Sequence, residues 1–196
     1  DLWHAVAFTP SGKDTTNNID YDSSYGMTLS LLYKRNLDHG FNHFAVMYGK
    51  GLMDEFSPFG QTNTPVASVD YNKQRNSSRM RFVEHLTLNM KKWAFHFAST
   101  LELRDSGEET NPGSTWFNVG VQPVYYFTDH YQLAGVLGTS SVSFDNAPTE
   151  RLTRITIAPQ IAMDKNIWGR PILRFFVTQS YWSKSLINRA EETSGG

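Results

Sequence analysis

Two arginines and two large aromatic residues share one side of the stretch from Ile167 to Thr178. With a period of two, that side carries Trp168, Arg170, Ile172, Arg174, Phe176 and Thr178, and the other side is apolar. Such alternation predicts a β-strand. Arginines beside aromatic rings indicate a face that contacts water and a ligand. In a transmembrane β-barrel, polar faces line a wet lumen and apolar faces meet lipid.

Other predicted strands carry polar side chains on the same kind of face. These residues are Arg81, His85, His96, Glu102, Asn118, Gln122 and Arg154. Together with Arg170 and Arg174, they can bond the hydroxyl groups of a solute or set the electric field of a lumen. Taken singly, each can equally belong to a solvated or mutually paired barrel wall. The sequence leaves both interpretations open.

Catalysis and metal binding have little support. His43, His85 and His96 could be paired with serines, but no Gly-x-Ser-x-Gly elbow occurs. The six histidines show no metal-ligand spacing, and the chain has no cysteine for a thiolate site. We therefore expect no enzyme, no metal and no cofactor.

The composition fits one sizeable β unit. The 196 residues are 39% hydrophobic and 14% aromatic, yet the mean hydropathy is only −0.44, because alternation conceals apolar faces. A net charge of −1 gives no reason to expect a nucleic-acid partner. No apolar run approaches the roughly 18–20 residues of a membrane helix.

Period-two segments recur about nine times. They cover residues 2–8, 25–34, 41–48, 79–90, 93–104, 116–127, 131–142, 154–163 and 167–178. Short turns at 36–40, 91–92, 128–130 and 164–166 alternate with longer loops at 49–78, 105–114 and 143–150. We therefore predict an all-β, antiparallel transmembrane β-barrel segment spanning residues 1–196, with long loops on one side and tight turns on the other.

Two features test that prediction. Aromatic residues cluster at the predicted strand ends, as in the interfacial girdles of a barrel. They are Tyr25, Tyr33, Tyr48, Trp93, Tyr125, Phe127 and Tyr131. Glu84 lies on an apolar face and needs a partner, which we expect from a subunit interface or a loop cation, unless it lies at the membrane edge.

Four blocks of sequence resemble the maltoporin family of sugar-specific outer-membrane porins. They are Gly40-Phe41-Asn42-His43-Phe44, Arg81 with Glu84-His85, Trp116-Phe117-Asn118-Val119-Gly120-Val121-Gln122-Pro123, and Ile167-Trp168-Gly169-Arg170-Pro171 with Arg174-Phe175. The resemblance implies an eighteen-stranded, homotrimeric barrel with a lumen track of aromatic residues, the greasy slide, on which sugars stack. By matching motif, Phe41 and Trp168 fall on slide positions. The polar candidates beside the track are Arg81, His85, Asn118, Gln122, Arg170 and Arg174.

About nine strands are half of such a barrel and cannot close so wide a pore. We therefore interpret the chain as the C-terminal half of a carbohydrate porin without its last strand, in the bacterial outer membrane, contacting lipid and a small sugar. The sugar itself is left open among maltodextrins, sucrose and β-glucosides. One alternative is a general diffusion porin. Another is a soluble β-sandwich carbohydrate-binding module, with Phe44, Val46, Phe95 and Phe97 in a dry core.

Overall fold

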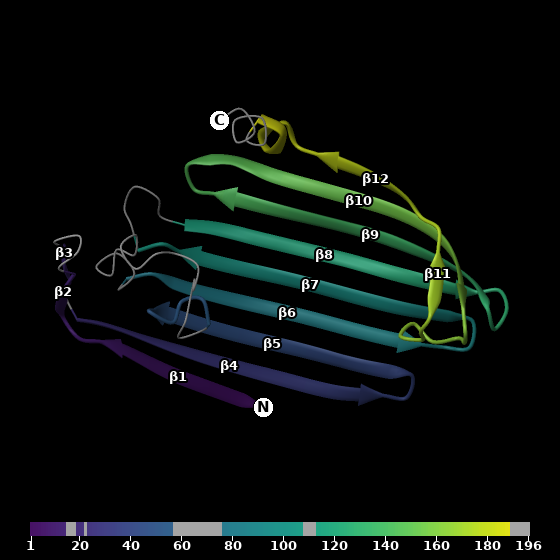
Figure 1. The fold of residues 1–196 in the computed structure, drawn as a ribbon, viewed down its shortest axis with the longest axis horizontal. Coiled ribbons are helices and arrows are strands. Elements are labelled where there is room, and N and C mark those ends of the chain that lie inside the picture. Colours follow the sequence, from purple (N-terminus) through teal and green to yellow (C-terminus); the bar gives the residue numbers. More distant parts are fainter. Residues whose placement is uncertain (15–18, 22, 57–75, 108–112, 189–196) are drawn as a thin grey trace.

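The structure, a computed structural model, describes residues 1–14, 19–21, 23–56, 76–107 and 113–188. One antiparallel sheet dominates it, with β1, β4 to β10 and β11 in sequence order and β12 also paired with β10 (Figure 1). The bounds are β1 Leu2–Thr9, β4 Ser24–Leu37, β5 Gly40–Gly51, β6 Ser78–Asn89, β7 Trp93–Asp105, β8 Gly113–Tyr126, β9 Tyr131–Phe144, β10 Ala147–Ala162, β11 Ile172–Arg174 and β12 Val177–Trp182. β2 (Gly12–Asp14) and β3 (Ile19–Tyr21) form a separate small hairpin. The predicted all-β, antiparallel architecture is confirmed.

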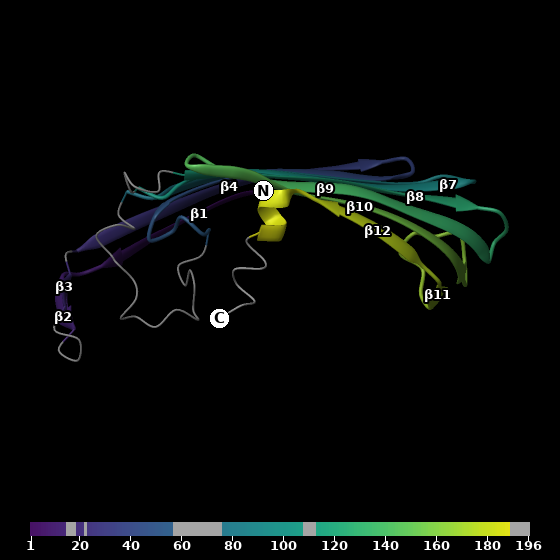
Figure 2. The ribbon, with the colours of Figure 1, turned by 90° about the horizontal axis from the view of Figure 1, so that it is seen from above.

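The sheet is a single curved layer (Figure 2). We call its concave side, on which β11 and the preceding turn lie, the inner face, and its convex side the outer face. The soluble alternative, which placed Phe44 and three other residues in a dry core between two sheets, is wrong. Phe44 lies on the outer face and is exposed. Within the described residues, no helix is long and apolar enough to cross a membrane.

The two faces have the polarity of a membrane barrel. Along β4, every second residue from Tyr25 to Tyr33 is apolar and exposed, whereas Ser24, Gly26 and Thr28 on the inner face are buried. Beyond β10, Leu173, Phe175 and Val177 are 57%, 64% and 78% exposed. A soluble protein would bury such residues. The predicted inversion, apolar residues outward and polar residues inward, is therefore confirmed.

The predicted strand from Ile167 to Thr178 is only partly correct. Alternation holds from Ile172 onward, where Leu173 pairs with Ile161 and Val177 with Ile157 on the outer face. Residues 167–171 instead belong to a turn, closed by a 2.9 Å hydrogen bond from the Gly169 amide to the Asn166 carbonyl. Pro171 has no amide hydrogen to donate to a neighbouring strand, so it remains in the turn and β11 begins at the next residue, Ile172.

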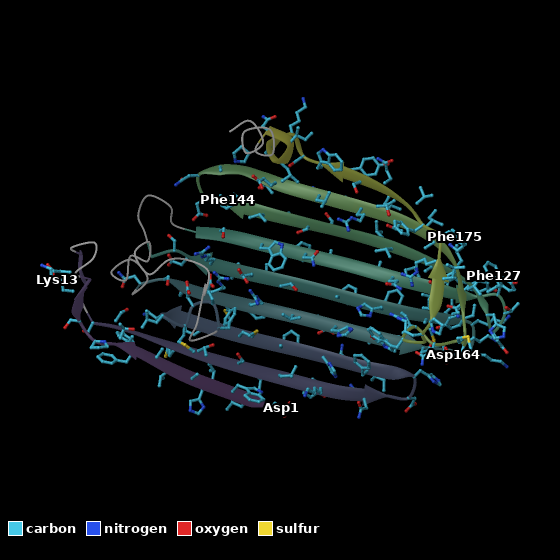
Figure 3. The ribbon with its side chains drawn as sticks, in the orientation of Figure 1. Asp1, Lys13, Phe127, Phe144, Asp164 and Phe175 are labelled. Atoms are coloured by element: carbon cyan, nitrogen blue, oxygen red, sulfur yellow. The ribbon has the colours of Figure 1, made fainter. Side chains whose placement is uncertain are left out.

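The connections are arranged as a barrel requires, with one exception. Phe127, Asp164 and Phe175 lie at the short-turn end of the sheet and Phe144 at the other end (Figure 3). The predicted loop over 143–150 is wrong, because β9 continues to Phe144 and β10 begins at Ala147, with a register shift before Glu150. Polar side chains there extend the strands rather than forming a loop. The β2–β3 hairpin lies between the first two predicted strands, and most of 49–78 and half of 105–114 lie outside the described residues.

Aromatic rings contact one another on the outer face at the short-turn end. The Trp93 and Tyr125 ring centroids are 4.6 Å apart, and those of Tyr125 and Phe127 are 4.9 Å apart.

The outer-face Glu84 accepts a hydrogen bond from the Asn42 amide on the adjacent strand. Within the described residues, Glu84 is therefore paired with a neighbouring side chain and not with a loop cation; its expected place at a subunit interface stays a prediction.

Candidate functional site

Phe41 is placed by a very close approach of two strands at the short-turn end. A Cβ on the preceding residue, Gly40, would lie 1.8 Å from the Thr87 carbonyl oxygen, so only glycine fits there. This approach sets Phe41 opposite Thr87 on β6, and Thr87 is in turn opposite His96 on β7. Residues directly opposite in a sheet share a face. Phe41, Thr87 and His96 therefore lie together on the inner face.

Trp168 reaches the inner face from the turn between β10 and β11 rather than from a strand. The turn is fixed to the sheet by a buried cluster, formed by Ala94, Val124, Tyr126, Ala134, Ala158 and Ile167. Two side chains of the sheet also hold its backbone. Asn89 donates to the Lys165 carbonyl at 3.0 Å, and Gln132 donates to the Asp164 carbonyl at 2.7 Å. Alternation along a strand is therefore not what directs Trp168 to the inner face, because Trp168 lies in a turn. The residue nevertheless contacts an inner-face side chain, His96.

Phe41 and Trp168 are the ends of a continuous row of rings across three elements of the sheet and the turn. The Phe41 centroid is 5.2 Å from that of His85, His85 is 4.5 Å from His96, and His96 is 5.5 Å from Trp168. His43 flanks the row at 4.7 Å from Phe41. We call Phe41, His85, His96 and Trp168 the ring row. Its ring planes are inclined to those of their neighbours by 86°, 45° and 71° along the row, and the imidazole nitrogen atoms lie in its centre.

The six polar candidates do not form one group. His85 is part of the ring row, and Gln122 lies opposite His96 on β8. Arg170 is exposed in the turn beside Trp168, where it donates to the Gly169 carbonyl at 2.7 Å. These three are the polar candidates that the structure places beside the two aromatic candidates.

The other three polar candidates lie elsewhere on the inner face. Arg174 donates to Gln160 at 2.9 Å, and Gln160 donates to Gln132 at 2.6 Å, so that the arginine belongs to a chain of hydrogen bonds on the wall. Asn118 lies opposite Thr100, further toward the long-loop end. Arg81 lies in a separate charged cluster beyond it.

The charged cluster consists of Arg79, Arg81, Glu102 and Glu55, with the Phe56 ring against it. Glu102 accepts a 2.6 Å hydrogen bond from Nε of Arg81, and its other oxygen is 3.4 Å from Arg79. Arg79 also lies 3.4 Å from Glu55, and the Arg81 guanidinium lies 4.9 Å from the centre of the Phe56 ring. Arg81 is thus a paired wall residue that attaches the segment after β5 to the inner face.

A sheet with apolar residues outside and a polar, ring-lined inside is what a water-filled barrel needs. The family model of the LamB porins matches residues 1–196. The chain belongs to the LamB porin family. LamB porins are β-barrel channels of the outer membrane, so the family is one of transport channels rather than enzymes. The sequence resemblance to maltoporins is thereby confirmed.

Sequence reasoning missed several inner-face residues of this LamB porin chain. Thr87, which is buried between two histidines, was not named as a site candidate. Trp116, whose indole donates to the Ser140 hydroxyl at 3.0 Å, was quoted only as part of a family block. Alternation assigns both to polar faces, so a signal was present. Within the described residues of the porin chain, no group of three or more His, Asp or Glu side chains could hold a metal ion.

Proposed function

We propose that this LamB porin chain lines a pore through which a small sugar or oligosaccharide diffuses passively across the bacterial outer membrane. The observation that carries the proposal is the ring row, which runs without interruption across the inner face from Phe41 to Trp168. A pore for ions alone has no need of such a surface. The apolar C–H face of a sugar ring packs well on an aromatic plane.

Weak contacts suit this task. Each stacking contact contributes on the order of 0.5–1.5 kcal/mol. A conducting site has to release its ligand as readily as it captures it, so repeated weak sites are preferable to one tight site. Phe41 and Trp168 act as stacking platforms. His85, Gln122 and Arg170 bond the sugar hydroxyls beside them, and Arg81, Asn118 and Arg174 form the wall further along.

The chain works as one segment of a larger barrel. Its sheet runs from β1 at one edge to β11 and β12 at the other, and further strands are needed to enclose a pore. The outer face contacts the lipid of the outer membrane. By analogy with the family, three complete barrels form a homotrimer. No cofactor and no energy source are needed, because the solute follows its gradient.

The test measures sugar-induced block of ion current in the complete porin, reconstituted in planar bilayers. Trp168→Ala should weaken sugar block and leave ion conductance nearly unchanged or higher. Trp93→Ala is the matched control, because Trp93 lies on the outer face against Tyr125. Sugar block that is unaltered in Trp168→Ala would refute the stacking role.

A general diffusion porin with the same fold is the rival function. Liposome swelling separates the two, because a sugar porin admits oligosaccharides faster than other polar solutes of similar size. Equal rates for both classes of solute would favour the general porin.

A further inference from the structure

We propose that His85 and His96 form an imidazole bridge that carries the sugar from Phe41 to Trp168, and that this bridge works in its neutral form. The inference rests on the proposed function. It adds a binding segment between the two aromatic platforms, and it makes capture of an uncharged ligand dependent on pH.

The first argument is distance. Phe41 lies on β5 and His96 on β7, so two strand spacings, about 10 Å, separate their strands. A sugar leaving Phe41 would cross this gap without an apolar surface unless rings filled it. His85 on β6 and His96 on β7 do so, one ring for each strand, and adjacent rings are 4.5–5.5 Å apart from Phe41 to Trp168.

The second argument is that the bridge is fixed to the wall. The Thr87 hydroxyl lies 3.3 Å from Nε2 of His85 and 3.5 Å from Nδ1 of His96. A hydroxyl has one proton to donate, so it can donate to one imidazole while it accepts from the other. This arrangement needs at least one ring with an unprotonated nitrogen. The remaining nitrogen of each ring can then bond a sugar hydroxyl.

The third argument concerns charge. On β5, His43 faces the bridge, with its ring 6.0 Å from that of His85. The adjacent strand β8 contributes the uncharged Gln122 opposite His96. Two lysines lie at the margin of this region, and both are paired, Lys34 with Asp1 and Lys165 with Asp129.

Among the residues that the structure describes, Asp164 and Arg170 lie in the turn that carries Trp168, and Glu84 lies on β6 but on the outer face. Protonating the bridge therefore places like charges side by side. Imidazolium ions hold water, which a stacking sugar must displace. Imidazoles change charge between about pH 5 and 8. Sugar capture should consequently weaken as the pH falls through this range.

The experiment compares the complete wild-type porin with three variants in planar bilayers, at pH 7.5 and pH 5.0. The probes are maltotriose, sucrose and cellobiose, each tested by current block. His85→Gln/His96→Gln removes both rings, and His85→Phe/His96→Phe keeps rings but cannot titrate. His4→Gln is the matched control, since His4 lies on the outer face of β1, opposite Leu29. Ion conductance without sugar verifies that each variant forms a pore.

We expect the wild type and His4→Gln to bind the blocking sugar several-fold more weakly at pH 5.0. The Gln variant should bind at least about fivefold more weakly than wild type at pH 7.5, from the loss of two stacking contacts. The Phe variant should retain most binding, and both double variants, which keep only His43 of the three facing histidines, should respond to pH less than the wild type. Wild-type binding in the Gln variant, or a wild-type pH response in the Phe variant, would overturn the bridge. If Trp168→Ala still weakens block, the proposed function survives that result. Absence of block in the wild type at both pH values would overturn both.

Discussion

Placing one arginine on each side of β8 at membrane depth gives a quantitative test of the inverted polarity. The apolar band runs from Phe117 on this strand to Phe127, directly after its end and ten residues further along the chain. At about 3.4 Å per residue and a tilt of about 40°, this corresponds to about 26 Å along the membrane normal. A barrel's apolar band is about 25 Å tall. Val121 then lies about 3 Å from the midplane, where an outward arginine costs about 2–4 kcal/mol.

Gly120 is the matched position on the inner face. It lies between Ala98 and Gly138, and a Cβ there would meet nothing nearer than 3.8 Å. Val121→Arg should therefore lower the free energy of unfolding by about 2–4 kcal/mol, and Gly120→Arg should change it by less than about 1 kcal/mol. The assay is equilibrium denaturant unfolding of the complete porin in phospholipid vesicles. Equal costs for the two variants, or a larger cost for Gly120→Arg, would refute the reasoning.

Two further predictions concern the segment after β5 and its charged partners. Glu102→Ala removes the carboxylate that Arg79 and Arg81 share and leaves Arg79 with Glu55, so the free energy of unfolding should fall by about 1–3 kcal/mol; an unchanged unfolding midpoint would contradict this. Asp54 is buried in the turn after β5, and burial raises the pKa of its carboxyl above the usual value, although Ser77 and Arg79 oppose the shift. A raised folded-state pKa means that stability is lost as the pH rises from about 4. Asp54→Asn should therefore increase stability at pH 7 relative to wild type and have no effect at pH 3, and an equal effect at both would refute this assignment.

Alternation predicted most strands of the large sheet, because a β-barrel exposes its pattern directly in the sequence. Within the predicted strands 25–34 and 167–178, period two puts Leu29 and Leu173 on the apolar side, and both are exposed on the outer face. The loop prediction for residues 143–150 was wrong, because a polar composition is found both in loops and in strand ends outside the membrane. Ser143 and Glu150 suggested a loop, but polar residues also extend a strand beyond the apolar band. The turn at 167–171 happened to match a period of two.

The sequence was enough to select residues of the candidate site, but it did not predict which of their side chains contact one another. Alternation and family resemblance both selected Phe41, whereas the contact of His85 with His96 depends on the register between β6 and β7. Register follows from turn geometry and tight backbone contacts, such as that between Gly40 and Thr87. Trp168 depends on how its turn packs against the buried Ile167, which no periodicity reveals.

Accessibility of neighbouring positions on β10 tests the inverted polarity most directly. Ile157 faces outward and is 60% exposed, whereas the adjacent Thr156 faces inward, where its hydroxyl lies 2.8 Å from that of Thr178. The chain contains no cysteine, so a spin label can be placed on Ile157→Cys or Thr156→Cys alone. In bilayers, relaxation of the label at 157 should respond to oxygen, which concentrates in lipid, and that of the label at 156 to a water-soluble nickel complex. The reverse pattern, or a label at 157 shielded from both reagents, would contradict the inverted polarity.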